Sequence, residues 1–540
     1  MKSECLPFSQ IPHTTRLFSD FLCHHAKVRQ FYPRSARLSE WMMEEASALK
    51  YDPQRREAVA AILERQNQSW GASARVQQNI ARLRSGAATV VTGQQVGLFG
   101  GPAFSLYKAL TSVKLAAQAT QAGVDCVPIF WLATEDHDLE EVNQVALPGP
   151  DGALQKLTVP VQSVPAAPVG TVVFGPEIQA AVEAAAGWLG DSEVTALLRA
   201  AYRPGETFGS AFARLFAQLF ADWGVILLDA SAPELHRIAA PIYGAAIERA
   251  AALDEALLAR GKELEAAGYH QQVKVTSSST LLFTRRNGAR IVVHRRPDGN
   301  GNEEFLIEDE RVSQNDLLNR IAAAPQNFSP NVLLRPVVQD YLLPTLAYTG
   351  GSAEVAYFSQ AAVVYEALLG HVTPVIPRFS STLVENKPNA LLERYGLTFL
   401  QVVDGEAALR EKMAAATLPT ELQSAFEGAE ASLEKSFHAI RSNLAQLDKT
   451  LVDAANNAES KMRHQIESLR ARAARAELRH AEVLSRHAEL LSNALYPNKA
   501  LQEREIAGIS FLARHGLPLL EQLYSALQTE CLDHQVISLE

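Results

Sequence analysis

The chain has 540 residues, of which 47% are hydrophobic and 20% are charged, and its formal net charge is -10. A chain of this length can bury a large core, and its acidic balance argues against general binding to nucleic acid or to a membrane surface. No stretch reaches the roughly 20 apolar residues of a membrane span, and the first residues show no secretory signal pattern.

The cysteines are far apart in the chain and form no CxxC pair; they are Cys5, Cys23, Cys126 and Cys531. We therefore expect neither a disulfide framework nor a cysteine-based zinc site. Cysteine usage of this kind fits a cytoplasmic protein best.

Strand-like and helix-like runs alternate after a leading segment, residues 1–85, that is predicted to be helical. Apolar runs at 89–92 and 126–132 flank a helical pattern at 106–119, and the buried-strand pattern WGVILLD follows at 223–229. Such alternation predicts a parallel sheet, whose strands carry binding and catalytic loops at their carboxyl ends.

Two insertions interrupt this order. The first is rich in proline, and the second contains alternating runs around Asn287-Gly288, which predict an antiparallel hairpin. The expected division is a leading segment at 1–85, core parts at 86–145, 201–250 and 329–400, insertions at 146–200 and 251–328, and a helical domain at 401–540.

Residues 421–495 contain no proline, and their apolar positions alternate four and three apart, which predicts a coiled-coil seam. The seam begins Leu433, Phe437, Ile440, Leu444, Leu447, Leu451, Ala454, Ala458. Two antiparallel helices or a dimer could use this seam, and a long helix packed on the core is the alternative.

The loop after the first predicted strand, GQQVGLFGGP, places glycines before a helix. Gly97, Gly100 and Gly101 could direct backbone amides at a carboxylate or at a phosphate such as that of a nucleotide, and Gln94 and Gln95 could contact a substrate. A tight strand-to-helix turn with packing glycines is the alternative.

The run EDHD after the next predicted strand gathers carboxylates around an imidazole. His137 could act as the catalytic acid or base, and Asp136 or Asp138 could hold an ammonium or hydroxyls. Capping of a helix is the alternative for part of this run. No second histidine stands at ligand spacing, so no metal is predicted.

Two further runs carry arginines. Arg335, in an apolar setting with Gln339 one turn later, could meet a carboxylate or phosphate of a substrate, unless it pairs internally with Asp340 or with a carboxylate of the acidic run. The Gly350-Gly351 turn before the next helix could accept the same kind of group. Arg378 and Ser380, in PRFSST, could contact phosphates or could only form a capping loop.

Six blocks of the chain together resemble the BshC family, the cysteine ligases of bacillithiol biosynthesis. They occur in the family's order over nearly the whole length: VTGQQVGLFGGP, FWLATEDHDLEEVN, GYHQQVKV with STLLF, SPNVLLRPVVQDYLLPTLAYTGG, PRFSSTL and LYPNKALQER. The resemblance implies an α/β fold: a Rossmann-like parallel-sheet core, similar to class I aminoacyl-tRNA synthetases, with two connecting insertions and a C-terminal coiled coil that forms a homodimer.

The same resemblance implies that L-cysteine is joined to the amine of glucosaminyl malate, with ATP activating the carboxylate. The turn at Tyr496, Asn498 and Lys499 would then contact the nucleotide. The HxGH signature of class I synthetases is absent, since GLFGGP stands in its place. Another ATP-dependent amide-forming ligase or nucleotidyltransferase, and a non-catalytic coiled-coil scaffold, remain alternatives.

Overall fold

The computed structural model describes residues 2–149, 152–296, 303–416, 420–478 and 482–539. Contacts divide the chain into two compact units. We call Ser3–Ser381 together with Glu503–Gln535 the cleft unit, and the remaining residues the coiled-coil unit. The division falls after Ser381, earlier than the expected boundary at 400/401, because the helices that follow it pack with a helix near residue 490.

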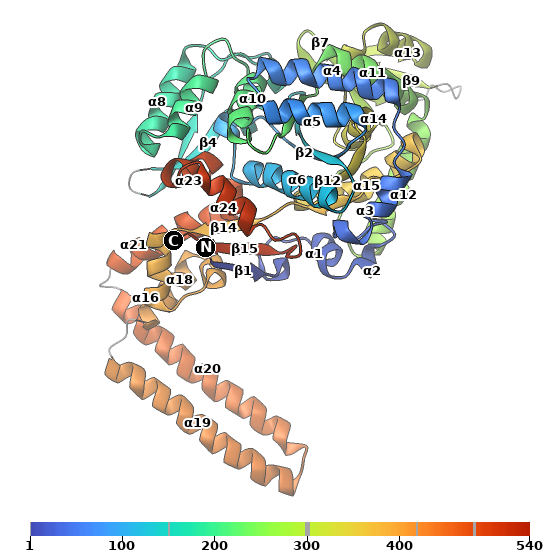
Figure 1. Cartoon of the computed structure of the whole chain (residues 1–540). Coiled ribbons are helices and arrows are strands. Elements are labelled where there is room, and N and C mark those ends of the chain that lie inside the picture. The colour runs from blue at the N-terminus through green and yellow to red at the C-terminus, as the bar shows by residue number, and fades with distance from the viewer. Residues whose placement is uncertain (1, 150–151, 297–302, 417–419, 479–481, 540) are drawn as a thin grey trace. The chain divides into compact units, whose positions relative to one another are not determined.

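A parallel sheet in the order β13-β12-β2-β3-β6 forms the centre of the cleft unit (Figure 1). Its strands are β2 (Ala88–Gln94), β3 (Cys126–Leu132), β6 (Ile226–Asp229), β12 (Thr345–Gly350) and β13 (Val375–Pro377). The strands expected at 89–92, 126–132 and 223–229 are confirmed. Chain order runs outward from β2 and then reverses to β12, so a crevice is expected where these two neighbours end.

Helices cover the sheet on both faces, which explains why the central strands are apolar on both sides. The covering helices are α4 (Pro53–Ser69), α5 (Ala74–Ser85), α6 (Phe104–Gln121), α10 (Phe208–Leu219) and α15 (Ser352–Leu369). Helices α11 (Pro233–Glu248) and α14 (Arg335–Leu342) pack against α4 and against each other. Phe130 of β3 is fully buried, and its ring centroid lies 5.9 Å from that of Phe212 and 5.2 Å from that of Phe216.

The first insertion contains the hairpin β4 (Gln144–Pro148) and β5 (Leu154–Thr158), followed by α8 (Glu177–Leu189) and α9 (Glu193–Ala201). The second contains α12 (Ala250–Ala266), α13 (Gln314–Ala323) and an antiparallel sheet of β7 (Ser279–Arg286), β8 (Ala289–Arg295), β9 (Glu304–Ile307), β10 (Glu310–Ser313) and β11 (Phe328–Pro330). The predicted hairpin is therefore confirmed. Its turn residues Asn287 and Gly288 have φ of 51° and 86°, as a tight hairpin turn requires.

Both ends of the chain contribute to the cleft unit. The leading segment contains β1 (Lys2–Leu6), which the sequence did not predict, and the helices α1 (Arg16–Cys23), α2 (His25–Val28) and α3 (Met42–Ala48). The closing segment contains α22 (Gln502–Glu505), α23 (Gly508–His515), α24 (Pro518–Ala526) and β15 (His534–Ser538). Helices α23 and α24 pack against α6, the helix after the first core strand.

The expectation that the cysteines form no disulfide is wrong for one pair. Cys5 and Cys531 are bonded, with their Cα atoms 6.6 Å apart. The fold brings the two ends together here, since the backbone N–H of Phe8 donates to Asp533 Oδ1 at 3.0 Å. The two cysteines are 526 residues apart in the sequence, so their spacing did not indicate that they pair.

The coiled-coil unit is mainly helical. It contains β14 (Ser381–Val384), α16 (Asn386–Tyr395), α17 (Phe399–Val403), α18 (Glu406–Ala416), α19 (Thr420–Leu447), α20 (Leu451–Leu478) and α21 (Glu482–Leu495). The long helices α19 and α20 form an antiparallel hairpin (Figure 1), and Arg441 pairs with Glu459 across it. Among the described residues, no helix is both long and apolar enough to cross a membrane.

The antiparallel pair is thus the form of the coiled coil that this chain adopts. The predicted seam is interrupted by a turn, where Asp448 accepts hydrogen bonds from the backbone N–H and the hydroxyl of Thr450 at 2.8 Å each. Leu447, at the end of α19, is 79% exposed because the helix stops there.

Shortening Phe130 to alanine tests the packing of the sheet core. We expect Phe130→Ala to lower the free energy of unfolding by about 3–5 kcal/mol, because it leaves a cavity against Phe212 and Phe216. Urea denaturation measures this loss. Val173→Ala, at a side chain that is 51% exposed, is the control and should change it by less than about 0.5 kcal/mol. Equal losses in the two variants would contradict the packing.

Candidate functional site

A cleft of about 690 Å³ opens at the carboxyl ends of β2, β3 and β12. It therefore lies at the point where the strand order reverses. The side chains that line it come from the core, from the second insertion and from the closing segment: Gln94, Gln95, Phe104, Lys108, Trp131, Asp136, Asp138, Glu141, Phe283, Arg290, Asn331, Val332, Arg335, Tyr348, Ser352, Glu354, Tyr357, Arg378 and Arg504.

The buried ammonium of Lys108, on α6, connects the two strand ends that border the crevice. Its Nζ donates to the carbonyl of Gly93 at 2.7 Å and to Gln94 Oε1 at 2.8 Å, and it lies 2.5 Å from Glu354 Oε2. Burial lowers the pKa of Lys108 to about 8, against the opposing effect of Glu354.

Glu354 belongs to the first turn of α15 and closes this network. It accepts from the Gly351 backbone N–H at 2.7 Å and from the Tyr348 hydroxyl at 2.5 Å. Burial favours its neutral form, but Lys108 outweighs burial, so the pKa of Glu354 lies below its usual value. The pair is therefore charged on both sides near neutral pH.

Arg335, at the start of α14, presents a guanidinium to the cleft. It donates to Gln339 Oε1 at 3.0 Å and to the Tyr357 hydroxyl at 3.1 Å, and it lies over the rings of Trp131 and Tyr348. No carboxylate among the described residues lies within ion-pair distance of it. Burial opposes its charge, but the phenols of Tyr357 and Tyr348 outweigh burial, so the pKa of Arg335 is raised.

The internal partner expected as the alternative for Arg335 is engaged elsewhere. Asp340 accepts from Gln339 Nε2 at 2.9 Å and from the Tyr365 hydroxyl. Gln339 itself is buried and does not line the cleft. It orients Arg335, so its predicted contact with substrate has no support in the structure.

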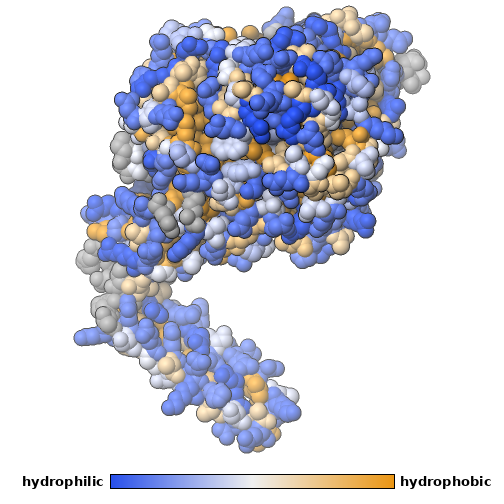
Figure 2. Space-filling model, in the orientation of Figure 1, coloured by the Kyte–Doolittle hydropathy of each residue, from blue (hydrophilic) through white to orange (hydrophobic). Residues whose placement is uncertain are grey.

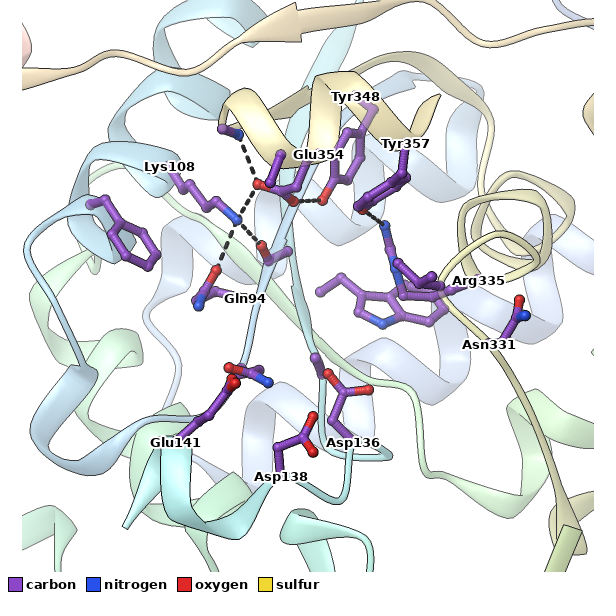
Figure 3. A pocket seen from close by; sticks show the side chains of 18 of the residues that line it. Gln94, Lys108, Asp136, Asp138, Glu141, Asn331, Arg335, Tyr348, Glu354 and Tyr357 are labelled. Carbon is purple, nitrogen blue, oxygen red and sulfur yellow. Dashed lines mark hydrogen bonds and ion pairs between the residues drawn. The ribbon is translucent and has the colours of Figure 1, made fainter. Parts of the chain in front are cut away.

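An acidic side faces these donors. Figure 3 shows Asp136, Asp138 and Glu141 together, across the cleft from Lys108 and Glu354. Burial raises the pKa of Asp136, and Arg290 and Arg335 offset this only in part. Arg290 Nη1 lies 3.6 Å from Asp136 Oδ1.

Arg290 comes from the second insertion and lies over the ring of Phe283, with its guanidinium carbon 3.9 Å from the centroid. It donates to Ser329 Oγ at 2.9 Å and to the Pro330 carbonyl at 2.6 Å. The insertion thereby supplies a fixed cation beside the acidic loop.

His137 does not line the main cleft. It lines an adjoining cavity of about 490 Å³, which shares Asp138 and Glu141 with the cleft. Its Nδ1 lies 3.4 Å from Arg290 Nη1, and because a guanidinium only donates, Nδ1 is the acceptor. The predicted role of His137 as proton acceptor stays a prediction.

Glu135, the first residue of the acidic run, turns toward α11. Its Oε1 lies 3.3 Å from His236 Nε2, and His236 Nδ1 lies 3.0 Å from the Tyr243 hydroxyl. Burial raises the pKa of Glu135 to about 8 and lowers the pKa of His236 to about 4. Both groups are therefore neutral near pH 7.

The glycine loop has a packing role. Gly97, Gly100 and Gly101 do not line the cleft. The N–H of Gly97 donates to the carbonyl of Gln95, and the N–H of Gly101 donates to the carbonyl of Leu98. The N–H of Gly100 donates to the carbonyl of Gly97 and to the hydroxyl of Tyr202. A Cβ on Gly97 would lie 3.2 Å from Gly101 Cα. The amides of these three glycines therefore donate within the fold, as the tight-turn alternative expects, and their contact with a nucleotide stays a prediction.

The second glycine turn is divided. Gly351 lines the cleft, whereas Gly350 is buried, and a Cβ on Gly350 would lie 2.8 Å from Glu354 Cβ.

Arg378 lines the cleft but donates to Glu503 Oε1 at 2.7 Å. Ser380 lies outside the cleft and donates to the same oxygen at 2.9 Å.

Tyr496, Asn498 and Lys499 belong to the coiled-coil unit. Asn498 and Lys499 have positive φ, of 53° and 59°, so the turn is sharply bent. Their contact with a nucleotide stays a prediction. In the described part of the chain, no group of three or more His, Cys, Asp or Glu side chains could hold a metal ion.

Several lining residues were not predicted. Lys108 had a signal, since it is a lysine on the otherwise apolar face of the helix after the glycine loop. Trp131, Tyr348 and Tyr357 are aromatic residues that sequence reasoning assigns to the core. Arg290 had no such signal, because nothing in the hairpin pattern shows that it reaches the cleft.

Comparisons with known proteins agree with this architecture. The family model described as the bacillithiol biosynthesis BshC N-terminal Rossmann-like domain matches residues 1–379, and the model of the BshC C-terminal coiled-coil domain matches residues 381–539. The chain belongs to the BshC family. The BshC fold expected from the sequence, a Rossmann-like parallel sheet followed by a helical coiled coil, is thereby confirmed.

Three BshC relatives, each named "Putative cysteine ligase BshC", cover nearly the whole chain. The protein from Koribacter versatilis is 49% identical over 99% of this chain and 100% of its own length. The protein from Solibacter usitatus is 37% identical over 99% and 100%, and that from Salinibacter ruber is 34% identical over 96% of each chain.

The neutral pair Glu135–His236 makes stability depend on pH. The folded-state pKa of Glu135, about 8, lies above its usual value of 4.5, so the folded state holds a proton that the unfolded state has lost. Stability therefore falls as pH rises through this window. The side chain of Glu135→Gln stays neutral at every pH. We therefore expect the free energy of unfolding of this variant, relative to that of wild type, to be higher at pH 8.5 than at pH 5.5 by at least about 1 kcal/mol.

Urea denaturation of both proteins at the two pH values measures this gain. Glu248→Gln, at an exposed carboxylate on α11, is the control and should show no such gain. A constant difference between Glu135→Gln and wild type across this range would refute the neutral pair.

Proposed function

We propose that this chain is a cysteine ligase of bacillithiol biosynthesis, which joins the carboxyl group of L-cysteine to the amine of glucosaminyl malate. The names of its relatives support the ligase activity. The observation that carries the proposal is the distribution of charge in the cleft. Arg335, which forms no ion pair with the described residues, lies on one side, and three carboxylates lie on the other.

Arg335 suits a carboxylate of either substrate. A guanidinium binds a carboxylate with two parallel hydrogen bonds, and the hydrogen bonds to Gln339 and Tyr357 hold its plane in place. The rings of Trp131 and Tyr348 have their centroids 6.0 Å and 5.3 Å from its guanidinium carbon, and this partly apolar setting strengthens its attraction for an anion.

The acidic side suits the amine. Asp136 or Asp138 would hold the ammonium of glucosaminyl malate and remove its proton before the nitrogen attacks the acyl carbon. Asp136 is the stronger candidate for the base, because burial raises its pKa toward the range in which a carboxylate accepts protons well. Its place in the main cleft also favours it over His137.

We propose ATP as a second substrate because an amine does not attack a carboxylate that has not been activated. Activation would convert the carboxylate of cysteine into an acyl phosphate with release of ADP, or into an acyl adenylate with release of pyrophosphate. Phosphate or AMP, respectively, would then leave with the bonding electrons when the amide forms. Arg504 is exposed at the edge of the cleft and is the cation best placed to meet phosphates. Tyr496, Asn498 and Lys499 remain candidates for the nucleotide.

An assay of the purified protein with L-cysteine, glucosaminyl malate and ATP tests the activity. We expect a thiol product in step with ATP consumption, and the appearance of ADP or of AMP identifies the activated intermediate. Product formation without ATP would refute the activation step. If another amine gives product and glucosaminyl malate does not, the proposed acceptor is wrong.

Replacing Arg335 with lysine tests the carboxylate contact. The charge remains, but the paired hydrogen bonds are lost, so we expect the KM of one carboxylate substrate to rise by at least about tenfold. Steady-state kinetics with each substrate varied in turn measures this. Arg320→Lys makes the same change at an exposed arginine on α13 and should leave both KM values unchanged. Unchanged kinetics in Arg335→Lys would contradict the role of Arg335.

We further propose that two copies of the chain associate through the coiled-coil hairpin. Apolar side chains remain exposed on it, and Figure 2 shows hydrophobic residues at its surface among hydrophilic ones. They include Ile440 at 43%, Leu447 at 79%, Met462 at 52% and Leu469 at 59% exposure. A second copy would remove this surface from water.

Charges placed on the hairpin test this association. Met462→Glu and Leu469→Glu should shift the mass measured by light scattering from that of a dimer to that of a monomer, because a buried carboxylate is costly. Ser442→Glu adds the same charge at an exposed polar position and should remain dimeric. A monomeric wild type would refute the proposal.

A further inference from the structure

The contacts of Lys108 determine what Gln94 offers to a ligand. An ammonium has three donors and no acceptor. The atom of Gln94 that faces Lys108 at 2.8 Å must therefore be the oxygen, and the amide NH₂ is left for other partners. Within the described residues, nothing accepts a hydrogen bond from Gln94 Nε2, and the side chain lines the cleft.

Asn331 is oriented in the same sense by a different contact. Its Oδ1 accepts from the backbone N–H groups of Leu333 at 3.0 Å and Leu334 at 3.1 Å, so its NH₂ is also the group left over. Asn331 lines the cleft beside Arg335, as Figure 3 shows. In the described part of the chain, its Nδ2 likewise has no acceptor.

We propose that Gln94 and Asn331, held as donors by Lys108 and by the turn before α14, form with Arg335 a carboxylate-binding side of the cleft, so that Lys108 is a positioning residue for substrate recognition. This inference rests on the proposed function. It adds two specificity-determining amides and the reason for their orientation.

The two sides of the cleft then differ in hydrogen-bonding character. Gln94, Asn331 and Arg335 offer donors, and the carboxylates of Asp136, Asp138 and Glu141 offer acceptors. A ligand with a carboxylate at one end and an ammonium or hydroxyls at the other matches both sides. Both L-cysteine and glucosaminyl malate have this chemistry, so the experiment must separate them.

Gln94→Glu is the decisive variant. A carboxylate keeps the size of the side chain and still accepts from Lys108, but it loses both donors and places a negative charge beside a bound carboxylate. Asn331→Asp makes the matching change, because the new carboxylate still accepts from the amides of Leu333 and Leu334. Both variants should therefore fold as wild type does, which thermal unfolding checks.

Gln78→Glu is the matched control. Gln78 is exposed on α5, and its Oε1 accepts from Arg75 Nη1 at 3.4 Å, so the substitution again keeps an acceptor and adds one charge. It lies outside the cleft lining. The control isolates the effect of donors inside the cleft from the effect of net charge.

Calorimetric titration of each protein with L-cysteine and, separately, with glucosaminyl malate gives the result. We expect Gln94→Glu and Asn331→Asp to weaken binding of one of the two ligands by about 10- to 100-fold, and Gln78→Glu to change neither. The ligand that is weakened is the one whose carboxylate meets this side.

Wild-type affinity for both ligands in Gln94→Glu and Asn331→Asp would overturn this inference while leaving the proposed function intact. A wild-type protein that binds neither ligand would overturn both. Lys108→Met together with Glu354→Gln removes the orienting ammonium without leaving a charge unpaired, and it should weaken the same ligand as Gln94→Glu does. Unchanged affinity in that double variant would overturn the positioning role of Lys108.

Discussion

The buried ammonium of Lys108 is the interaction on which the cleft depends. The cleft lies beyond the carboxyl ends of the paired strands β2 and β12. Lys108 contacts the end of β2 through Gly93 and Gln94, and it contacts the start of α15 through Glu354. Burial of the Lys108–Glu354 pair costs solvation energy, and the attraction between the two charges offsets this cost only when their geometry is good. The pair therefore serves mainly to fix the arrangement of the end of β2 relative to the start of α15.

The sheet could be predicted because its order is local in sequence. Each core strand is a short apolar run followed by a loop and a helix, and the parallel arrangement follows from that alternation. The acidic run could be assigned to a site for the same reason, since it directly follows the apolar strand β3 and loops at the carboxyl ends of parallel strands form such sites. Arg335 lies ahead of β12 and was found by a different signal, because an arginine in an apolar setting needs a partner.

The remaining features depend on long-range packing, which one sequence does not display. Arg290 reaches the acidic loop only because the second insertion folds back over the cleft. The glycine loop carries the residue types of an anion site, yet the amides of Gly97, Gly100 and Gly101 donate to acceptors within the fold, which the residue types alone do not show. The seam of the coiled coil continued through the turn near Asp448 because turn residues can maintain an apolar spacing by chance.

The closing segment Glu503–Gln535 returns to the cleft unit, so residues 382–502 are an insertion between two parts of that unit. The residues that flank this insertion lie together, since the Ser381 N–H donates to Glu503 Oε2 at 2.9 Å. A chain cut at the end of the sheet would lose Glu503 and leave the charge of Arg378 buried without its partner. Replacement of residues 382–502 by a short linker would therefore preserve the cleft, whereas truncation of the chain after residue 381 would not.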